Sequence, residues 1–170
     1  KDIAEMEHMI DGYLSFARGE GTENTVTASF DKIVKQIVDN YAKAHPGKLR
    51  LILSASSYPS LPMRVQAIRR VIDNLISNAL LYAHSAELRL KFLDDELILF
   101  IDDDGPGIDT KDYAEAVKPF VRLESSRNRQ TGGTGLGLSI ASDIISSHGG
   151  ELSFDKSPLG GLRVLIRLPV

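Results

Sequence analysis

A glycine-rich stretch at residues 131–140 constrains this chain more than any other part of it. The stretch reads TGGTGLGLSI, follows a basic loop and continues directly into apolar residues with helical spacing. Its glycines leave the backbone uncrowded, so that main-chain N–H groups can approach a polyanion closely. The helix that follows directs the positive end of its dipole at the same place. The stretch therefore indicates a phosphate-binding loop, although a glycine cluster can also form a plain turn.

The size and charge of the chain limit the class of protein. Its 170 residues suffice for one domain with a core and a short appendage, and the formal net charge of −3 implies no general affinity for nucleic acid or membranes. The lack of cysteine excludes a disulfide scaffold and thiolate metal sites. We find no signal peptide and no apolar run long enough to span a bilayer. The chain opens on Lys1 inside a helical pattern, so we expect a piece of a longer protein.

Residues 1–18 are expected to form a helix that packs on other helices. Their apolar positions alternate between spacings of three and four, which is the rhythm of a helical bundle. Two heptads cannot hold a lone helix together in water, so this stub is expected to be the end of a bundle. Residues 19–24 have the composition of a linker.

Helical and strand patterns are mixed over the rest of the chain. Helices are expected at 30–44, 64–83 and 136–147, and strands at 49–54, 87–93, 96–101, 151–154 and 163–168. Loops are expected at 58–62, 102–109 and 110–133, the last with a short helical tendency at 114–117. Two hairpins among the strands predict a two-layer α/β sandwich, with a mixed, mostly antiparallel sheet and helices on one face.

Two asparagines on the helix expected at 64–83 are the first residues that could form a functional site. Asn74 and Asn78 are one turn apart, so both amides project from the same face of an otherwise apolar helix. Such amides need partners, which can be each other, local backbone, or a hydrated cation with phosphates.

An acidic bend follows the next hairpin. The sequence from Asp102 to Ile108 reads DDDGPGI, so a strand ends in carboxylates and a Gly-Pro-Gly turn. A carboxylate there could accept a hydrogen bond from an exocyclic amine such as that of adenine, and glycine would admit a flat ring. An acidic β-turn is the simpler alternative.

A basic loop precedes the glycine-rich stretch. Phe120 could anchor one end of this segment, while Arg122, Arg127 and Arg129 could reach phosphates. The alternative is a solvated basic loop.

Taken in order, these four motifs resemble the N, G1, F and G2 boxes of sensor histidine kinases. This family belongs to the superfamily that includes gyrase, Hsp90 and MutL. The resemblance covers residues 24–170 as a catalytic domain, with an ATP lid at 109–133. Residues 1–20 resemble, more weakly, the end of the second dimerisation helix and its linker. The implied fold is a Bergerat-type sandwich with three helices on one face.

The resemblance also implies residue roles. Asn78 would hold the Mg²⁺ that bridges the ATP phosphates, and Asp103 would bind the adenine amino group. The residues expected to contact the nucleotide are Asn74, Asn78, Tyr82, Asp103, Gly105, Gly107, Ile108, Arg122, Gly133, Thr134, Gly135, Leu136, Gly137 and Leu138. Those expected to serve catalysis are Asn74, Arg122 and Arg127.

Asn74 bears on the type of reaction. ATP-hydrolysing relatives place a glutamate four residues before the magnesium asparagine, where it activates water. Here that residue is Asn74, and an amide is not a base. The neighbouring Asp73 is one step round the helix and is expected to point elsewhere. Phosphoryl transfer to a side chain is therefore preferred over hydrolysis.

Two departures from the family pattern stand out. Family members usually carry Lys or Arg at the position of Leu81, where it touches phosphate, and leucine cannot do so. None of the four histidines, His8, His45, His84 and His148, stands in a phospho-acceptor motif, and all are expected to be surface or packing residues. No cluster of metal-ligating residues appears.

The sequence therefore predicts the ATP-binding catalytic domain of a two-component sensor histidine kinase. It would transfer the γ-phosphoryl group of Mg·ATP to a histidine on dimerisation helices outside this chain, for relay to a response regulator. A homodimeric parent anchored in the inner membrane is expected, with this domain in the cytoplasm and no nucleic-acid or membrane contact of its own. The alternatives are an ATPase of the same superfamily, a serine kinase of the anti-sigma type, and a nucleotide-binding interaction module without transfer activity.

Overall fold

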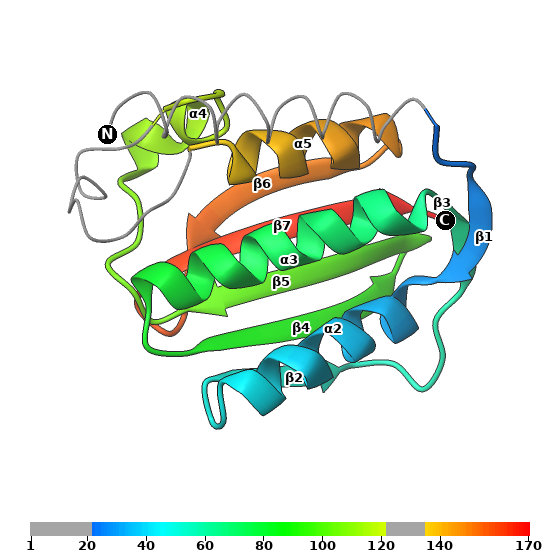
Figure 1. Cartoon of the computed structure of the whole chain (residues 1–170), viewed down its shortest axis with the longest axis horizontal. Coiled ribbons are helices and arrows are strands. Elements are labelled where there is room, and N and C mark those ends of the chain that lie inside the picture. The colour runs from blue at the N-terminus through cyan, green and yellow to red at the C-terminus, as the bar shows by residue number, and fades with distance from the viewer. Residues whose placement is uncertain (1–21, 122–134) are drawn as a thin grey trace.

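Three helices cover one face of a five-stranded sheet in the computed structural model, which describes residues 22–121 and 135–170 (Figure 1). The helices are α2 (Phe30–Ala44), α3 (Val65–Tyr82) and α5 (Gly137–Ser147). The strands, in their order across the sheet, are β2 (Leu49–Leu53), β4 (Ala86–Leu93), β5 (Glu96–Asp103), β7 (Leu162–Pro169) and β6 (Glu151–Lys156). Only the β2–β4 pair in this described sheet is parallel. The predicted two-layer, mostly antiparallel sandwich is confirmed, while the predicted helix at residues 1–18 lies outside the described residues.

The core lies between the helices and the inner face of the sheet. Helix α3 runs across the middle of that face (Figure 1) and buries one continuous stripe. The stripe comprises Ala67, Ile68, Val71, Ile72, Leu75, Ile76 and Ala79. The spacing of three and four residues turns these side chains toward the sheet, where Leu88, Leu99 and Ile166 are fully buried against them. Asn74 and Asn78 lie at the edge of this stripe and are only half-buried, so their amides can contribute to a site.

A two-residue turn joins β4 to β5. Asp94 and Asp95 have φ angles of 52° and 59°, so both occupy the left-handed region that a type I′ hairpin turn requires. Aspartate tolerates this region better than most residues. The predicted hairpin is confirmed, and it brings Asp102 and Asp103 next to the beginning of β4.

A small second sheet was not expected. Residues 58–62 were predicted to form a loop, but β3 (Ser60–Met63) pairs antiparallel with β1 (Val26–Ser29). Pro62 misled the prediction because proline interrupts a sheet ladder, yet it is tolerated in a short edge strand. Ser29, the last residue of β1, precedes α2, but its Oγ lies 3.1 Å from Oγ of Ser60 and makes no capping hydrogen bond to the helix.

The acidic bend also begins later than predicted. Asp102 and Asp103 were assigned to the loop, but they are the last residues of β5, because the ladder to β4 continues as far as the pair of Ala86 with Asp103. Beyond the bend, η1 (Thr110–Asp112) and α4 (Tyr113–Ala116) form a short helical segment close to the position where the sequence indicated one.

The first turn of α3 is capped from outside the helix. Oε1 of Glu23 accepts a hydrogen bond from the N–H of Gln66 at 2.6 Å, and Oε2 accepts from Ala67 at 3.0 Å. These N–H groups have no acceptor within the helix, and a carboxylate suits the positive end of the dipole. The segment that was expected to be only a linker therefore anchors the helix that carries Asn74 and Asn78.

Membrane insertion of a helix can be assessed for the described part of the chain. None of its helices combines the length and the apolar composition that a bilayer crossing requires.

Candidate functional site

Asp103 lies at the end of β5 and is only 7% exposed. Its Oδ1 accepts hydrogen bonds from the N–H groups of Gly105 at 2.9 Å and Leu162 at 3.0 Å. Its carbonyl oxygen accepts a third from Gly161. Burial raises the pKa of Asp103, and the two N–H donors offset this only in part. Both N–H groups that bind the carboxylate within the described residues reach Oδ1, so Oδ2 is the oxygen that a ligand could use.

Glycines make this arrangement possible. A Cβ on Gly161 would lie 2.0 Å from Oδ1 of Asp103, and a Cβ on Gly105 would lie 2.9 Å from the carbonyl oxygen of Tyr82. Gly107 has a φ of +70° and packs against the backbone of Gly161. The acidic bend, the end of α3 and the turn before β7 are therefore in close backbone contact, which only glycine permits here.

Asp104 faces the opposite direction from Asp103 and binds the connection between α3 and β4. Oδ1 accepts hydrogen bonds from the N–H groups of His84 and Ser85, both at 2.8 Å, and Oδ2 accepts from the hydroxyl of Ser85 at 2.7 Å. The backbone N–H of Ser85 is the largest cause of the lowered pKa of Asp104.

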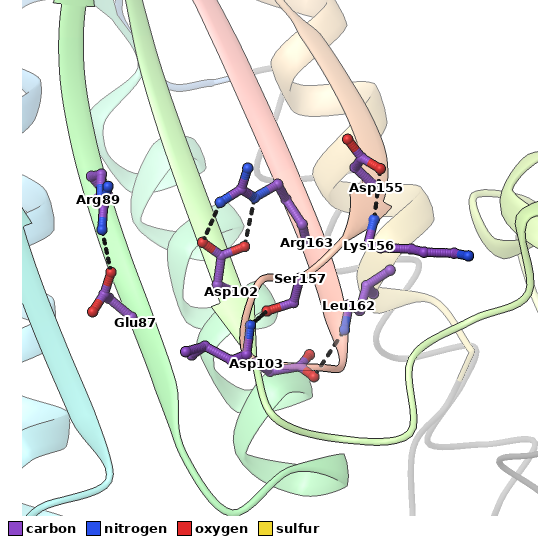
Figure 2. A network of polar contacts seen from close by, with 10 residues as sticks. Glu87, Arg89, Asp102, Asp103, Asp155, Lys156, Ser157, Leu162 and Arg163 are labelled. Carbon is purple, nitrogen blue, oxygen red and sulfur yellow. Dashed lines mark hydrogen bonds and ion pairs between the residues drawn. The ribbon is translucent and has the colours of Figure 1, made fainter.

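Asp102 belongs to the outer face of the sheet, because successive residues of a strand point to opposite faces. Figure 2 shows its carboxylate paired with Arg163 of β7, while Asp103 points toward Leu162. The pair is bidentate, with distances of 2.6 and 2.8 Å, and Asp102 is only 3% exposed. The guanidinium also lies 4.8 Å from the ring centroid of Phe100. The hydrogen bonds with Asp102 raise the pKa of Arg163. The two residues are partners in the β5–β7 ladder, so the pair joins these strands beside Asp103.

Asn74 and Asn78 occupy successive turns of α3 and are both half-buried. The side-chain N–H of Asn74 donates to the carbonyl oxygen of Gly137, the first residue of α5, over a long 3.4 Å. Gly137 lies close to this amide, since a Cβ there would be 3.9 Å from Cβ of Asn74. The N-terminus of α5 therefore lies against the asparagine face of α3.

Asp73 lies on another side of α3, as predicted. The hydroxyl of Tyr41, on α2, donates to the carbonyl oxygen of Asp73 at 3.5 Å. Burial raises the pKa of the Asp73 carboxyl, and the charge of Arg69 and hydrogen bonding by Tyr41 partly oppose this. Asp73 therefore interacts with α2, whereas Asn74 interacts with α5.

The glycine-rich stretch is described from Gly135 onward. Gly135 has a φ of +70°, and its carbonyl oxygen accepts from the N–H of Phe120 at 3.1 Å. Leu136 is buried, and its carbonyl oxygen accepts from the hydroxyl of Ser139 at 2.9 Å. The backbone just before α5 is thus tied to the residues that end the described part of the loop after α4.

The described candidate residues form two groups that α3 connects. Tyr82, Asp103, Gly105 and Gly107 meet at the acidic bend, with Ile108 packed on the core, and Asn74 meets Gly137 at the start of α5. Eight residues of helix separate Asn74 from Tyr82, which is about 12 Å. Asn78 lies between the two groups, and Leu138 is half-buried in the first turn of α5. The predicted residues Arg122, Arg127, Gly133 and Thr134 lie outside the described residues.

The sequence did not predict that the turn before β7 contacts Asp103. Gly161 and Leu162 bind Asp103 at its carbonyl oxygen and at Oδ1. The consecutive glycines at 160 and 161 were the available signal. The sequence likewise predicted no role for Asp104, which stands in the acidic bend.

Three of the four histidines lie in the described part of the chain, and each can be placed in the fold. Nε2 of His148 accepts from the backbone N–H of Arg64 at 3.0 Å, while its Nδ1 hydrogen bonds to the carbonyl oxygen of Ile144 at 2.7 Å, which confirms a packing role. His45 follows the end of α2, and His84 lies in the connection after α3. Among the described residues, no three His, Cys, Asp or Glu side chains form a cluster that could hold a metal ion.

Comparison with known proteins places this geometry in context. The family model described as "Histidine kinase-, DNA gyrase B-, and HSP90-like ATPase" matches residues 63–170. The sensor protein RstB of Escherichia coli K12 is 36% identical over 100% of this chain and 40% of its own length. The sensor histidine kinase CpxA of the same strain is 32% identical over 97% of this chain and 37% of its own length. The chain thus spans about two fifths of these relatives.

A solved structure shows the same fold. Full-length ShkA in complex with AMPPNP matches 95% of this chain and 35% of its own chain, with a TM-score of 0.78 and 20% sequence identity.

Proposed function

We propose a function from the family of this chain, which belongs to the histidine kinase-, DNA gyrase B- and HSP90-like ATPases. It is the catalytic ATP-binding domain of a two-component sensor histidine kinase. The proposed reaction is the phosphorylation of a histidine by Mg·ATP. The acceptor histidine would lie on dimerisation helices of the same protein. From there the phosphoryl group would pass to an aspartate of a response regulator.

The arrangement around Asp103 carries this proposal. Two N–H donors converge on Oδ1 and hold the carboxylate in one orientation, which leaves Oδ2 to accept a hydrogen bond from the adenine amino group. Gly105 and Gly107 hold the bend against Tyr82 and Gly161. The adenine ring would lie along this bend, beside Ile108 and Tyr82. The complex of ShkA with AMPPNP supports a nucleotide as the ligand of this fold.

The other end of the site would hold the phosphates. Amide and phosphate oxygens are hard ligands of the kind Mg²⁺ prefers, so Asn78 would contribute one protein ligand and the nucleotide most of the others. Bound there, the ion would neutralise charge that develops during transfer. Main-chain N–H groups from Gly135 to Leu138, and the positive end of α5, would face the phosphates. Gly133, Thr134, Arg122 and Arg127 are proposed for the same role.

The chemistry of Asn74 supports transfer over hydrolysis. Its amide cannot take a proton from water, and Asp73 interacts with α2 instead. The site would therefore act by positioning and by charge stabilisation, and an acceptor brought in by the dimerisation helices would receive the phosphoryl group.

The proposal extends to the organisation of the chain. Residues 1–20 would be the end of the second dimerisation helix and a linker, and residues 24–170 would be the catalytic domain with a lid at 109–133. The parent would be a homodimer anchored in the inner membrane, with this domain in the cytoplasm.

Leu81 favours a second candidate. It is 39% exposed on α3, and it stands where the family usually has a phosphate-binding Lys or Arg. A domain that lacks this contact could bind nucleotide as an interaction module and transfer nothing.

Two measurements test the proposal. Calorimetric titration with AMPPNP should give a binding heat for the wild type that Mg²⁺ increases. Asp103→Ala should remove this heat, while Asp39→Ala, on the exposed side of α2, should not. Equal heats from wild type and Asp103→Ala would contradict the adenine contact. Radiolabelled ATP should then label a histidine-bearing dimerisation hairpin supplied in trans. An unlabelled hairpin would support the interaction module, and label on this chain's own histidines would refute the proposed acceptor.

A further inference from the structure

Asp104 makes more hydrogen bonds than its exposed position requires. Its carboxylate accepts two backbone N–H bonds at 2.8 Å and one hydroxyl bond at 2.7 Å, all from His84 and Ser85. Its own N–H donates to the carbonyl oxygen of Ser85 at 3.2 Å. Four hydrogen bonds therefore join a single residue of the acidic bend to the two residues that precede β4.

His84 and Ser85 belong to the connection that follows α3, the helix that carries Asn74 and Asn78. Helix α3 ends at Tyr82, and the N–H of Ala83 completes its last turn by donating to Ala79. His84 and Ser85 follow immediately and lead into β4. A displacement of this connection would displace the last turns of α3, including Asn78, which is one turn before Tyr82.

The other side of Asp104 is continuous with the adenine-binding carboxylate. Asp103 precedes it directly, and Gly105 follows it and donates to Oδ1 of Asp103. Gly105 also packs on the end of α3, since a Cβ there would lie 2.9 Å from the carbonyl oxygen of Tyr82 and 3.2 Å from Cβ of Ala83. Asp104 thus lies where the end of the strand bearing one ligand contact meets the end of the helix bearing the other.

We propose that Asp104 is a positioning residue that fixes the separation between the carboxylate of Asp103 and the amide of Asn78. The inference rests on the proposed function, because only a ligand that engages both ends of the site makes this separation important. With Asp104 in place, purine and magnesium–phosphate contacts form at the same time. Without it, a nucleotide can satisfy one end only by straining the other.

This role differs from simple stabilisation in what it predicts. A loss of stability alone would weaken binding of all nucleotides to the same extent. A loss of spacing would instead reduce the increase in affinity that Mg²⁺ gives, because Mg²⁺ acts through Asn78 while Asp103 keeps its own donors, Gly105 and Leu162.

Calorimetric titration with AMPPNP, with and without Mg²⁺, tests the role. Asp104→Ala should reduce the magnesium-dependent gain in affinity about tenfold and leave binding without Mg²⁺ nearly unchanged. Asp104→Asn should restore most of the gain, because its side-chain oxygen can still accept from both N–H groups. Ser85→Ala removes one of the hydrogen bonds and should have an intermediate effect, which keeps the test valid if Asp104→Ala fails to fold. Asp39→Ala, which changes an exposed aspartate of α2 that pairs with Lys35, serves as the control.

The outcomes separate this inference from the proposed function. A wild-type protein that binds no AMPPNP would overturn both. A wild type that responds to Mg²⁺, with Asp104→Ala responding equally, would overturn only the positioning role. The role would also be refuted if Asp104→Ala weakened binding equally with and without Mg²⁺, or if Asp104→Asn were as defective as Asp104→Ala.

Discussion

Gly161 lies against Asp103 so closely that a Cβ on residue 161 would be 2.0 Å from Oδ1 of Asp103 and 2.7 Å from its carbonyl oxygen. The N–H of Gly161 donates to that same carbonyl oxygen. The bare Cα of Gly161 is therefore part of the wall that holds the carboxylate.

Gly161→Ala should remove nucleotide binding and destabilise the domain. The added methyl group must displace either Asp103 or β7, and overpacking of this kind costs about 2 kcal/mol. We expect a decrease in Tm of roughly 4–8 °C and no binding heat with AMPPNP.

Gly160→Ala provides a matched comparison. A Cβ there meets nothing within 4 Å, although its φ of +106° is unfavourable for alanine. This variant should lose about 1 kcal/mol of stability and keep its affinity for AMPPNP. Similar binding by both alanine variants would show that the close contact with Asp103 has no functional importance.

Asp103→Asn should bind no nucleotide and yet be more stable than the wild type at pH 7. Burial raises the pKa of Asp103, so folding favours the protonated carboxyl. The protonated carboxyl therefore adds to the free energy of unfolding below the usual carboxyl pKa. This stabilisation is lost as the pH rises through the raised pKa of the folded state. Asparagine resembles the protonated form at every pH and can still accept from Gly105 and Leu162.

The stability difference should therefore depend on pH. We expect Asp103→Asn to exceed the wild type by roughly 2–4 °C in Tm at pH 7, with a difference that shrinks toward pH 4. Thermal unfolding without nucleotide across this range measures it. A lower Tm than the wild type at pH 7 would show that hydrogen bonding to the ionised carboxylate outweighs the cost of its burial.

Leu81→Lys should increase the affinity for ATP analogues. The side chain is 39% exposed on the helix that bears Asn78, so a lysine can extend toward the proposed phosphate position. We expect AMPPNP to bind about threefold to tenfold more tightly, and adenosine to bind as before. Leu93→Lys, at a position that is 56% exposed on β4, makes the same change of charge. If the two variants gain equally, the effect comes from net charge and not from a local phosphate contact.

Glu23→Ala should destabilise the start of α3. The helix would lose both acceptors for the N–H groups of Gln66 and Ala67, at a cost of about 1 kcal/mol. Hydrogen exchange at these two amides should accelerate, and Glu23→Gln should show a smaller effect because it retains one acceptor. Glu96→Ala, which removes an exposed ion pair with Arg167, should leave both amides unchanged. Unchanged exchange in Glu23→Ala would mean that the cap contributes nothing in solution.

Most of the fold was predictable because its main elements have strong local patterns. The apolar stripe of α3 has helical spacing, and the β4–β5 hairpin has two aspartates at its turn. The β1–β3 pair was not predictable, since each strand is short and one contains Pro62. The cap from Glu23 was also not predictable, because it joins residues 43 and 44 positions apart.

The candidate site also contains residues that the sequence predicts and residues that it does not. Asn74, Asn78 and Asp103 stand in short motifs whose chemistry can be recognised from residue types and spacing, and their roles stay predictions. The contributions of Gly161 and Leu162 follow from the pairing of β5 with β7, which no local pattern specifies. Asp104 was missed as a positioning residue because its partners belong to the exit of a helix 19 and 20 residues earlier.

The bonds from Leu162 to Asp103 and from Arg163 to Asp102 span 59 and 61 residues. During synthesis, β5 can pair with β4 well before β7 leaves the ribosome, and until then both carboxylates lie on an open strand edge. A nascent chain at that stage has no rigid purine site to offer. Nucleotide can therefore rescue the folding of a weakened variant only after translation has passed β7, and not while the chain is still being made.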